Sequence, residues 1–300
     1  MIQKPKSIIL SSGGILVLAH VSALIILDSH KLLSNVTKWG GVSGGALIAT
    51  CIALGYTLKE ILEICERFDF QVLQKIDEDS PFTFMNTLGL DNSDTLTKFI
   101  NALFTVRGWP INITFKELYA LNKSNIIIWA SNIDTGTLVE FSIQKTPNTP
   151  ISFALHASIQ IPIIYPPLMY KDTNHLLVDG ALIHSMPLDE LDISDYDTCL
   201  GILCRSQPPQ PCPRDVIGYI KHIISIGMDS RSKMILKQFN GKIIHIVLPS
   251  NFSGTNFNLS LEQKKILLEA GSSAANEWYR SKIEEHSFKN IKKCIRRHSI

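Results

Sequence analysis

Residues 36–54 of the 300-residue chain read VTKWGGVSGGALIATCIAL. The first letters include β-branched and aromatic side chains and end in glycines, which predicts a strand over Val36–Gly41. The letters after Ser43 are almost all apolar and predict a buried helix over Gly44–Leu54. A serine between a strand and a helix, with a glycine two residues to either side, is typical of a nucleophile elbow.

Three glycines shape this turn: Gly41, Gly44 and Gly45. Side chains in those places would collide in so tight a bend, and the N-terminus of the following helix favours negative charge beside Ser43. The pentapeptide Gly-x-Ser-x-Gly alone is a weak indication of a nucleophile, because an ordinary glycine-rich turn can have the same residues. The strand before it and the helix after it favour a nucleophile.

A second glycine turn lies upstream, where Ser12-Gly13-Gly14 follows an apolar stretch, Ser7–Leu10, that predicts a buried strand. Backbone N–H groups at such a turn bind an anion or an oxyanion, although a plain tight turn would look the same. The turn is not a nucleotide-binding loop, since it lacks Gly-Lys-Ser/Thr and a complete Gly-x-Gly-x-x-Gly.

The run Ile8–Leu27 carries no formal charge and has the composition of a signal peptide or a membrane helix, with Val21-Ser22-Ala23 as a cleavage site. Poor helix formers at Ser11–Gly14 interrupt this run. A strand, a turn and a buried helix therefore fit it better.

The rest of the chain alternates between strand and helix patterns, and residues 71–125 predict a less regular cover near the site. Helices are predicted to begin at three capping boxes. Alternation of this kind predicts an α/β fold with a mostly parallel sheet covered on both faces. The strands are expected at Ile126–Ala130, Val139–Ile143, Leu176–Val178, Thr198–Leu203 and Lys242–Leu248, and the capping boxes at Thr57–Glu60, Thr114–Glu117 and Ser260–Gln263.

The composition excludes several classes of protein. Hydrophobic residues make up 45% of the chain, enough for a sizeable core. The 29 basic and 27 acidic residues give a net charge of +2, too little to argue for nucleic acid as a partner. The six cysteines have no metal-ligand spacing with each other or with histidine, so no metal site is expected.

A serine nucleophile needs a base, and the residues alone leave two alternatives. In an ordinary α/β-hydrolase the base is a histidine, for which His222, His245 and His286 are candidates without local support. The other candidate is Asp179, at the end of a strand in Val178-Asp179-Gly180-Ala181, although Asp-Gly is also a common turn.

Taken together, the two glycine turns and the Asp-Gly pair resemble the patatin-like phospholipase family over most of the chain. Gly41–Leu47 resembles its nucleophile elbow, Leu10–Gly14 its glycine-rich oxyanion loop, and Val178–Ala181 its acid motif. The segment before the acid, with Ala157-Ser158 and Tyr165-Pro166-Pro167, is also similar. Three motifs in the family's order are far more specific than any one.

The resemblance implies a three-layer α/β/α fold and a lipid acyl hydrolase of the phospholipase A or esterase type. Ser43 would form an acyl-enzyme, with Asp179 as the general base and Gly180 and Ala181 completing the acid motif. Backbone N–H groups of Gly13 and Gly14 would form the oxyanion hole. It further implies no cofactor, no metal and independence from Ca²⁺, with a phospholipid or another acyl-ester lipid as the substrate.

One departure from the family pattern affects the expected substrate. The family usually carries a basic residue followed by glycine after the loop, where this chain has Leu16 and Val17. Loss of that cation predicts weaker activity on anionic head groups and favours neutral acyl esters. A catalytically weak lipid-binding protein of the same fold is the alternative. The usual Asn before the last Pro is also replaced, by Ser185.

The resemblance also bears on location and boundaries. Cleavage after Ala23 would remove the oxyanion loop, so a secretory signal is not expected, and we expect an intracellular protein, soluble or peripheral at a membrane. Residues 1–285 are predicted to form the phospholipase domain and residues 286–300 a basic tail. In the tail, Phe288, Ile291 and Ile295 form a stripe among basic residues that would dock on an anionic bilayer, although a solvated, frayed terminus is favoured.

Overall fold

A computed structural model of the chain describes residues 2–77, 79–206, 212 and 214–297, with only the backbone of residues 217, 221 and 288–297. Within these residues one sheet has the strand order β5-β6-β3-β2-β1-β7-β8, and β4 pairs with β3. Neighbouring strands from β3 to β8 along this order run parallel, whereas β4 and β6 run antiparallel to β3. The strands are β1 (Ser7–Leu10), β2 (Lys38–Val42), β3 (Asn125–Asn132), β4 (Thr137–Ser142), β5 (Leu168–Tyr170), β6 (His175–Asp179), β7 (Cys199–Ser206) and β8 (Ile243–Leu248).

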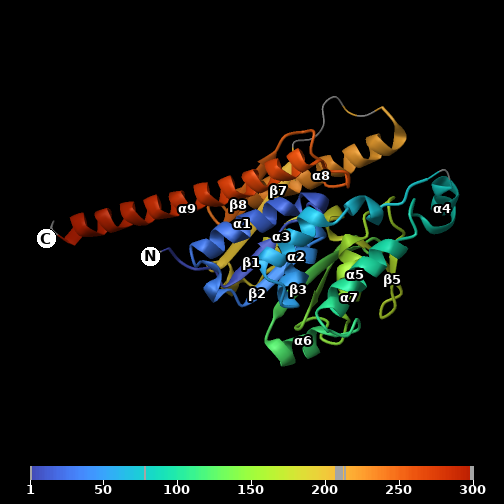
Figure 1. The fold of residues 1–300 in the computed structure, drawn as a ribbon. Coiled ribbons are helices and arrows are strands. Elements are labelled where there is room, and N and C mark those ends of the chain that lie inside the picture. Colours follow the sequence, from blue (N-terminus) through green and yellow to red (C-terminus); the bar gives the residue numbers. More distant parts are fainter. Residues whose placement is uncertain (1, 78, 207–211, 213, 298–300) are drawn as a thin grey trace.

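Helices cover both faces of the sheet (Figure 1). Alternate residues of β1 face opposite cores, since Ile8 and Leu10 belong to the larger core and Ile9 to the smaller one. The predicted three-layer α/β/α fold with a mostly parallel sheet is confirmed. The helices are α1 (Leu18–Ser29), α2 (Gly44–Ala53), α3 (Leu58–Arg67), α4 (Ser80–Thr87), α5 (Asp94–Val106), α6 (Phe115–Asn122), α7 (Ile151–Ile159), α8 (Val216–Gln238) and α9 (Leu261–Arg297).

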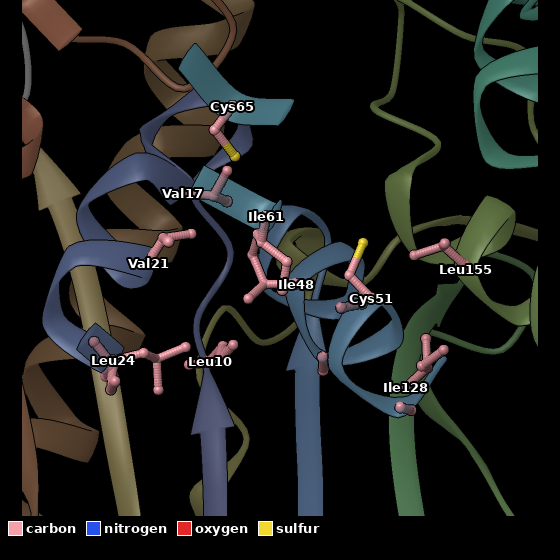
Figure 2. Close-up of a cluster of buried hydrophobic side chains, with 14 of the residues drawn as sticks. Leu10, Val17, Val21, Leu24, Ile48, Cys51, Ile61, Cys65, Ile128 and Leu155 are labelled. Carbon is pink, nitrogen blue, oxygen red and sulfur yellow. The ribbon is translucent and has the colours of Figure 1, made fainter. Parts of the chain in front are cut away.

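The larger core holds the helices that follow the two glycine turns. Figure 2 shows side chains of α1, α2 and α3 meeting above the sheet, among them Val21, Ile48 and Ile61. Cys51 and Cys65 are buried thiols in this cluster. Burial of these helices fixes the two turns at one edge of the sheet, where the parallel strands end.

The apolar run near the N-terminus forms β1, a short 3-10 helix (Gly14–Val17) and α1. The strand–turn–helix interpretation of Ile8–Leu27 is therefore confirmed. Among the helices that the structure describes, none combines the length and hydropathy that crossing a bilayer requires.

Local signals predicted helix starts better than strand ends. Side chain and backbone bond reciprocally in the capping boxes at Thr57, Thr114 and Ser260. The elbow strand runs over Lys38–Val42, two residues later than predicted at its start and one at its end, because pairing with β3 continues to Val42 although pairing with β1 ends at Gly41.

Two helices carry information beyond the prediction. The sequence patterns gave no indication of α8, because apolar residues occur on both its inner and its outer face and blur the helical period. The helix α9 runs through residue 285, the predicted boundary between domain and tail, and that division stays a prediction. The side chains of residues 288–300 lie outside the described residues, so docking by the tail also stays a prediction.

Candidate active site

Ser43 lies at the sharp turn between β2 and α2, with φ of 54° and ψ of −125°. This backbone conformation is strained for any residue with a side chain. The flanking glycines allow the turn. A Cβ at Gly41 would lie 2.3 Å from the carbonyl carbon of Gly45, and a Cβ at Gly45 would lie 2.3 Å from the Leu10 carbonyl oxygen. The predicted steric reason for glycine therefore holds at both positions.

Strand β3 brings Ser43 and Asp179 together across 136 residues of chain. Val42, the last residue of β2, pairs with Trp129. Asp179, the last residue of β6, pairs with Ala130, the next position along β3. The two side chains consequently meet, and the Ser43 hydroxyl donates a hydrogen bond of 2.5 Å to Asp179 Oδ2.

The Asp179 carboxyl is held in an almost dry environment. Asp179 is 4% exposed and Ser43 is 3% exposed. Burial raises the pKa of Asp179 from 3.8 to about 7, opposed by the hydrogen bonds from Ser43 and from the Ala181 N–H, which lies 2.8 Å from Oδ1. Gly180 is needed between them, because a Cβ there would lie 2.4 Å from the Trp129 carbonyl oxygen.

The Gly13-Gly14 turn packs directly against the elbow. Gly14 has φ of +51°, in the region that favours glycine. A Cβ at Gly44 would lie 2.7 Å from the Gly14 carbonyl oxygen and 3.2 Å from its amide nitrogen. The loop between β8 and α9 holds this turn from outside, since the Ile15 N–H donates to the Gly254 carbonyl at 3.1 Å. Two glycine turns 30 residues apart thus form one site.

Ser158, near the end of α7, bonds the backbone of Ser43, although no role for it was inferred from the sequence. Its hydroxyl accepts the Ser43 backbone N–H at 2.8 Å and donates to the Trp129 carbonyl at 2.7 Å. Ser158 therefore ties the elbow to β3. A serine that follows buried apolar residues of the helix, Leu155 and Ala157, is the signal in the sequence that points to such a role.

Ser11 and His20 are buried beside the glycine turn and lie within hydrogen-bonding distance of each other. The Ser11 hydroxyl lies 3.2 Å from His20 Nε2, accepts the Cys204 N–H at 3.0 Å and lies 2.8 Å from the Ser12 carbonyl. Burial lowers the pKa of His20 to about 4, so its ring is neutral at ordinary pH. The sequence placed His20 inside an apolar helix, and only the fold shows that it lies under the turn.

The two departures from the family pattern occupy distinct positions. Leu16 and Val17 are buried, and Val17 packs toward Gly44, where a Cβ would meet its Cγ1 at 2.4 Å. Buried apolar side chains thus stand at the sequence positions where the family usually has a basic residue and a glycine. Ser185 joins two parts of the site, because its carbonyl accepts the Ser12 N–H at 2.9 Å and its hydroxyl bonds Ser232 of α8 at 2.9 Å.

The candidate histidine bases do not bond Ser43. In the part of the chain that the structure describes, the Ser43 hydroxyl donates to Asp179 and to no histidine. His245 instead accepts from Arg205 Nε at 3.1 Å, and His222 lies on α8. Within the same residues no group of three histidine, cysteine or acidic side chains is arranged to hold a metal ion.

Relatives with similar sequences occur in viruses and bacteria. A protein of Acanthamoeba polyphaga mimivirus is 29% identical over 276 residues, which cover 89% of this chain and 91% of that protein. The protein named "Probable lipid hydrolase 463L" of Invertebrate iridescent virus 6 is 27% identical over 185 residues, 61% of this chain and 62% of that protein. YqhO of Bacillus subtilis is 24% identical and covers 88% of this chain and 94% of that protein.

Solved structures share the fold at low sequence identity. VipD of Legionella pneumophila aligns over 93% of this chain and 67% of its own, with a TM-score of 0.63 and 16% identity. The type III effector ExoU aligns over 93% of this chain but 54% of its own, with a TM-score of 0.54 and 15% identity. The sequence pattern that defines patatin-like phospholipases matches residues 8–192, which include both glycine turns and the acid motif. The chain therefore belongs to the patatin-like phospholipase family.

Proposed function

We propose that this protein hydrolyses fatty-acyl ester bonds of lipids through a Ser43–Asp179 dyad. The observation that carries the proposal is the direct 2.5 Å hydrogen bond between the two side chains in a buried site. The family and the relative named as a lipid hydrolase support a lipid ester as the substrate class.

In the first half of the reaction, Ser43 Oγ attacks the ester carbonyl carbon while its proton passes to Asp179 Oδ2. Collapse of the tetrahedral intermediate breaks the bond to the alcohol, which leaves with the proton from Asp179, and an acyl-enzyme remains. In the second half Asp179 takes a proton from water, the hydroxide attacks the acyl carbon, and the fatty acid leaves as Ser43 recovers its proton.

The environment of Asp179 suits this role. A carboxylate with an ordinary pKa near 3.8 is a weak base for a serine hydroxyl. Because burial raises the pKa of Asp179 to about 7, the carboxylate is a stronger base that is about half ionised at pH 7 and mostly ionised above it.

The Gly13 and Gly14 amides are proposed to bind the oxyanion. Their turn packs on Gly44, next to the nucleophile, and the N-terminus of α2 adds the positive end of its dipole at Ser43. Each such donor typically lowers the barrier by about 3–4 kcal/mol.

Neutral acyl esters are the proposed preference, because Leu16 and Val17 are buried where a cation would meet an anionic head group. Turnover of a charged phospholipid is compared with that of its neutral diacylglycerol. Comparable rates support the preference, and a strong phospholipid preference contradicts it.

The experiment that tests the dyad is hydrolysis of a fluorogenic acyl ester and of mixed phospholipid vesicles by wild type, Ser43→Ala and Asp179→Asn. Both variants should lose activity. Ser22→Ala is the matched control, because it removes a buried hydroxyl that, among the described residues, bonds only within α1, to the Ala19 carbonyl at 3.1 Å. Wild-type activity equal to that of Ser43→Ala, with vesicle binding retained, would show a lipid-binding protein that has lost catalysis.

A further inference from the structure

The outer surface of α8 is apolar and has no covering element among the described residues. Its exposed apolar side chains recur every three or four residues over the first three turns, so they form one stripe. Their exposed fractions run from 38% to 74%, well above those of the buried side of the same helix. This outer α8 stripe consists of Val216, Tyr219, Ile220, Ile223, Ile226 and Met234.

The opposite side of α8 already holds the helix on the sheet. Ile235 and Phe239, which follows the helix, are buried in the smaller core, with Leu236 packed against it. Ser232 is also buried and bonds Ser185. Since packing on the protein uses that side, the outer stripe is not needed for folding, and its exposure is unfavourable in water.

Charge accompanies the apolar stripe. Between residues 216 and 238 the sequence has four basic residues and one acidic residue, Asp229. Arg231 is paired with Asp189 at 3.1 Å, and Asp229 is paired with Arg205 and, at 2.7 Å, with Lys233, so the helix and its ion-pair partners together keep a basic excess. A helix with an apolar face and a basic excess is complementary to an anionic lipid surface.

The position of α8 relates the stripe to the catalytic site. Strand β7 runs parallel to β1, so both end at the edge of the sheet where the glycine turns lie. The helix α8 follows β7 in the chain and reaches the glycine turn through Ser232, which bonds Ser185, whose carbonyl accepts the Ser12 N–H. Figure 1 shows the N-terminal end of α8 and α4 at the same end of the molecule. The C-terminal end of α9 lies at the opposite end.

Helix α4 is a weaker candidate at that end. It exposes Phe82 and Met85, but it has no basic residue of its own and two acidic residues, Asp77 and Asp79, precede it, and an anionic surface would repel them. At the start of α8 the single acidic residue, Asp215, follows Arg214. The stripe on α8 combines exposed apolar side chains with a basic excess, and α4 does not.

We propose that the outer α8 stripe docks on an anionic lipid bilayer and holds the catalytic edge of the sheet at the membrane surface. This inference rests on the proposed function for its substrate, and it assigns membrane contact to α8 rather than to the C-terminal tail. From Val216 to Met234 the stripe is about 27 Å long, which suits a helix lying in the plane of the interface.

The test is sedimentation of the full chain with vesicles of phosphatidylcholine alone and of phosphatidylcholine with one fifth phosphatidylglycerol. Ser43→Ala is used as the background so that no lipid is consumed. The Ser43→Ala background protein, with α8 unchanged, should bind the anionic vesicles. Adding Ile223→Ser and Ile226→Ser to it should weaken that binding at least about tenfold. Ile193→Ser is the matched control, because Ile193 is 83% exposed and lies near the start of β7, at the other edge of the sheet. It should bind as the background protein does.

Two results would overturn the proposal: no binding of the background protein to anionic vesicles, or unchanged binding by the α8 double variant. A third result would also overturn it. If the background protein self-associates in ultracentrifugation, the double variant does not, and neither binds vesicles, then a second copy of the chain covers the stripe. Hydrolysis of a water-soluble ester, measured in the chain with Ser43 intact, separates this proposal from the function. The double variant with Ser43 intact should hydrolyse the soluble ester as wild type does. If wild type does not hydrolyse the ester but the chain binds vesicles through α8, the proposed function is refuted and the docking proposal is not.

Discussion

Asp179→Asn is expected to abolish activity and to stabilise the fold at alkaline pH. The substitution keeps the shape of the side chain and the acceptor for the Ala181 N–H, but it removes a carboxyl whose pKa rises from 3.8 to about 7 on folding. A raised pKa means that the folded state disfavours the charged form, so ionised Asp179 lowers stability and protonated Asp179 does not.

The magnitude follows from linkage. Below about pH 4 Asp179 is protonated in both the folded and the unfolded protein, and its contribution to the free energy of unfolding is fully present. That contribution is lost as the pH rises to the folded-state pKa near 7. At pH 8 the buried charge costs the folded protein about 4 kcal/mol as an upper bound, and at pH 5 about 2 kcal/mol. The free energy of unfolding of wild type should therefore fall by about 2–3 kcal/mol relative to Asp179→Asn between these two pH values.

Urea unfolding of both proteins at pH 5 and pH 8 measures the difference. Ser43→Ala is the informative companion, because removing a hydrogen bond that lowers the pKa of Asp179 should move the decline to higher pH. In wild type kcat/KM should rise with pH and level off above about 7, since the base must be ionised. A difference in stability between wild type and Asp179→Asn that does not change with pH would refute the assignment of a buried carboxyl with a raised pKa.

Substitutions at three positions test how the site is built. Ser43→Gly should be inactive and about 1 kcal/mol more stable than Ser43→Ala, since both lack the hydroxyl that bonds Asp179 and only glycine relieves the positive φ; thermal unfolding of the two variants measures the difference. Ser158→Ala should lower the free energy of unfolding by about 1–3 kcal/mol, because the Ser43 N–H and the Trp129 carbonyl lose their partner. It should also lower kcat more than it changes KM. Ser158→Thr, which keeps the hydroxyl, should recover part of both losses. Gly14→Ala should abolish ester hydrolysis, because its Cβ would lie 1.9 Å from the Gly254 carbonyl oxygen; an active Gly14→Ala protein would show that the turn does not bind the oxyanion.

The sequence by itself determined the local parts of this protein. The glycines around Ser43, the apolar runs and the capping boxes act over a few residues, so their steric and hydrogen-bonding requirements are readable from neighbours in the chain. Those signals were sufficient for the α/β class and for the turn that carries Ser43. With the family resemblance they also identified Asp179 as the candidate base.

Only the tertiary structure decided how those parts meet. The contact of Ser43 with Asp179 depends on the register of two strands along β3, and the pKa of Asp179 depends on burial by segments distant in sequence. The support of the site by Ser158 and His20 has the same origin. The outer face of α8 remained hidden for a related reason: a pattern of apolar residues does not say which of them find a partner, and that depends on which side of the helix packs on the sheet.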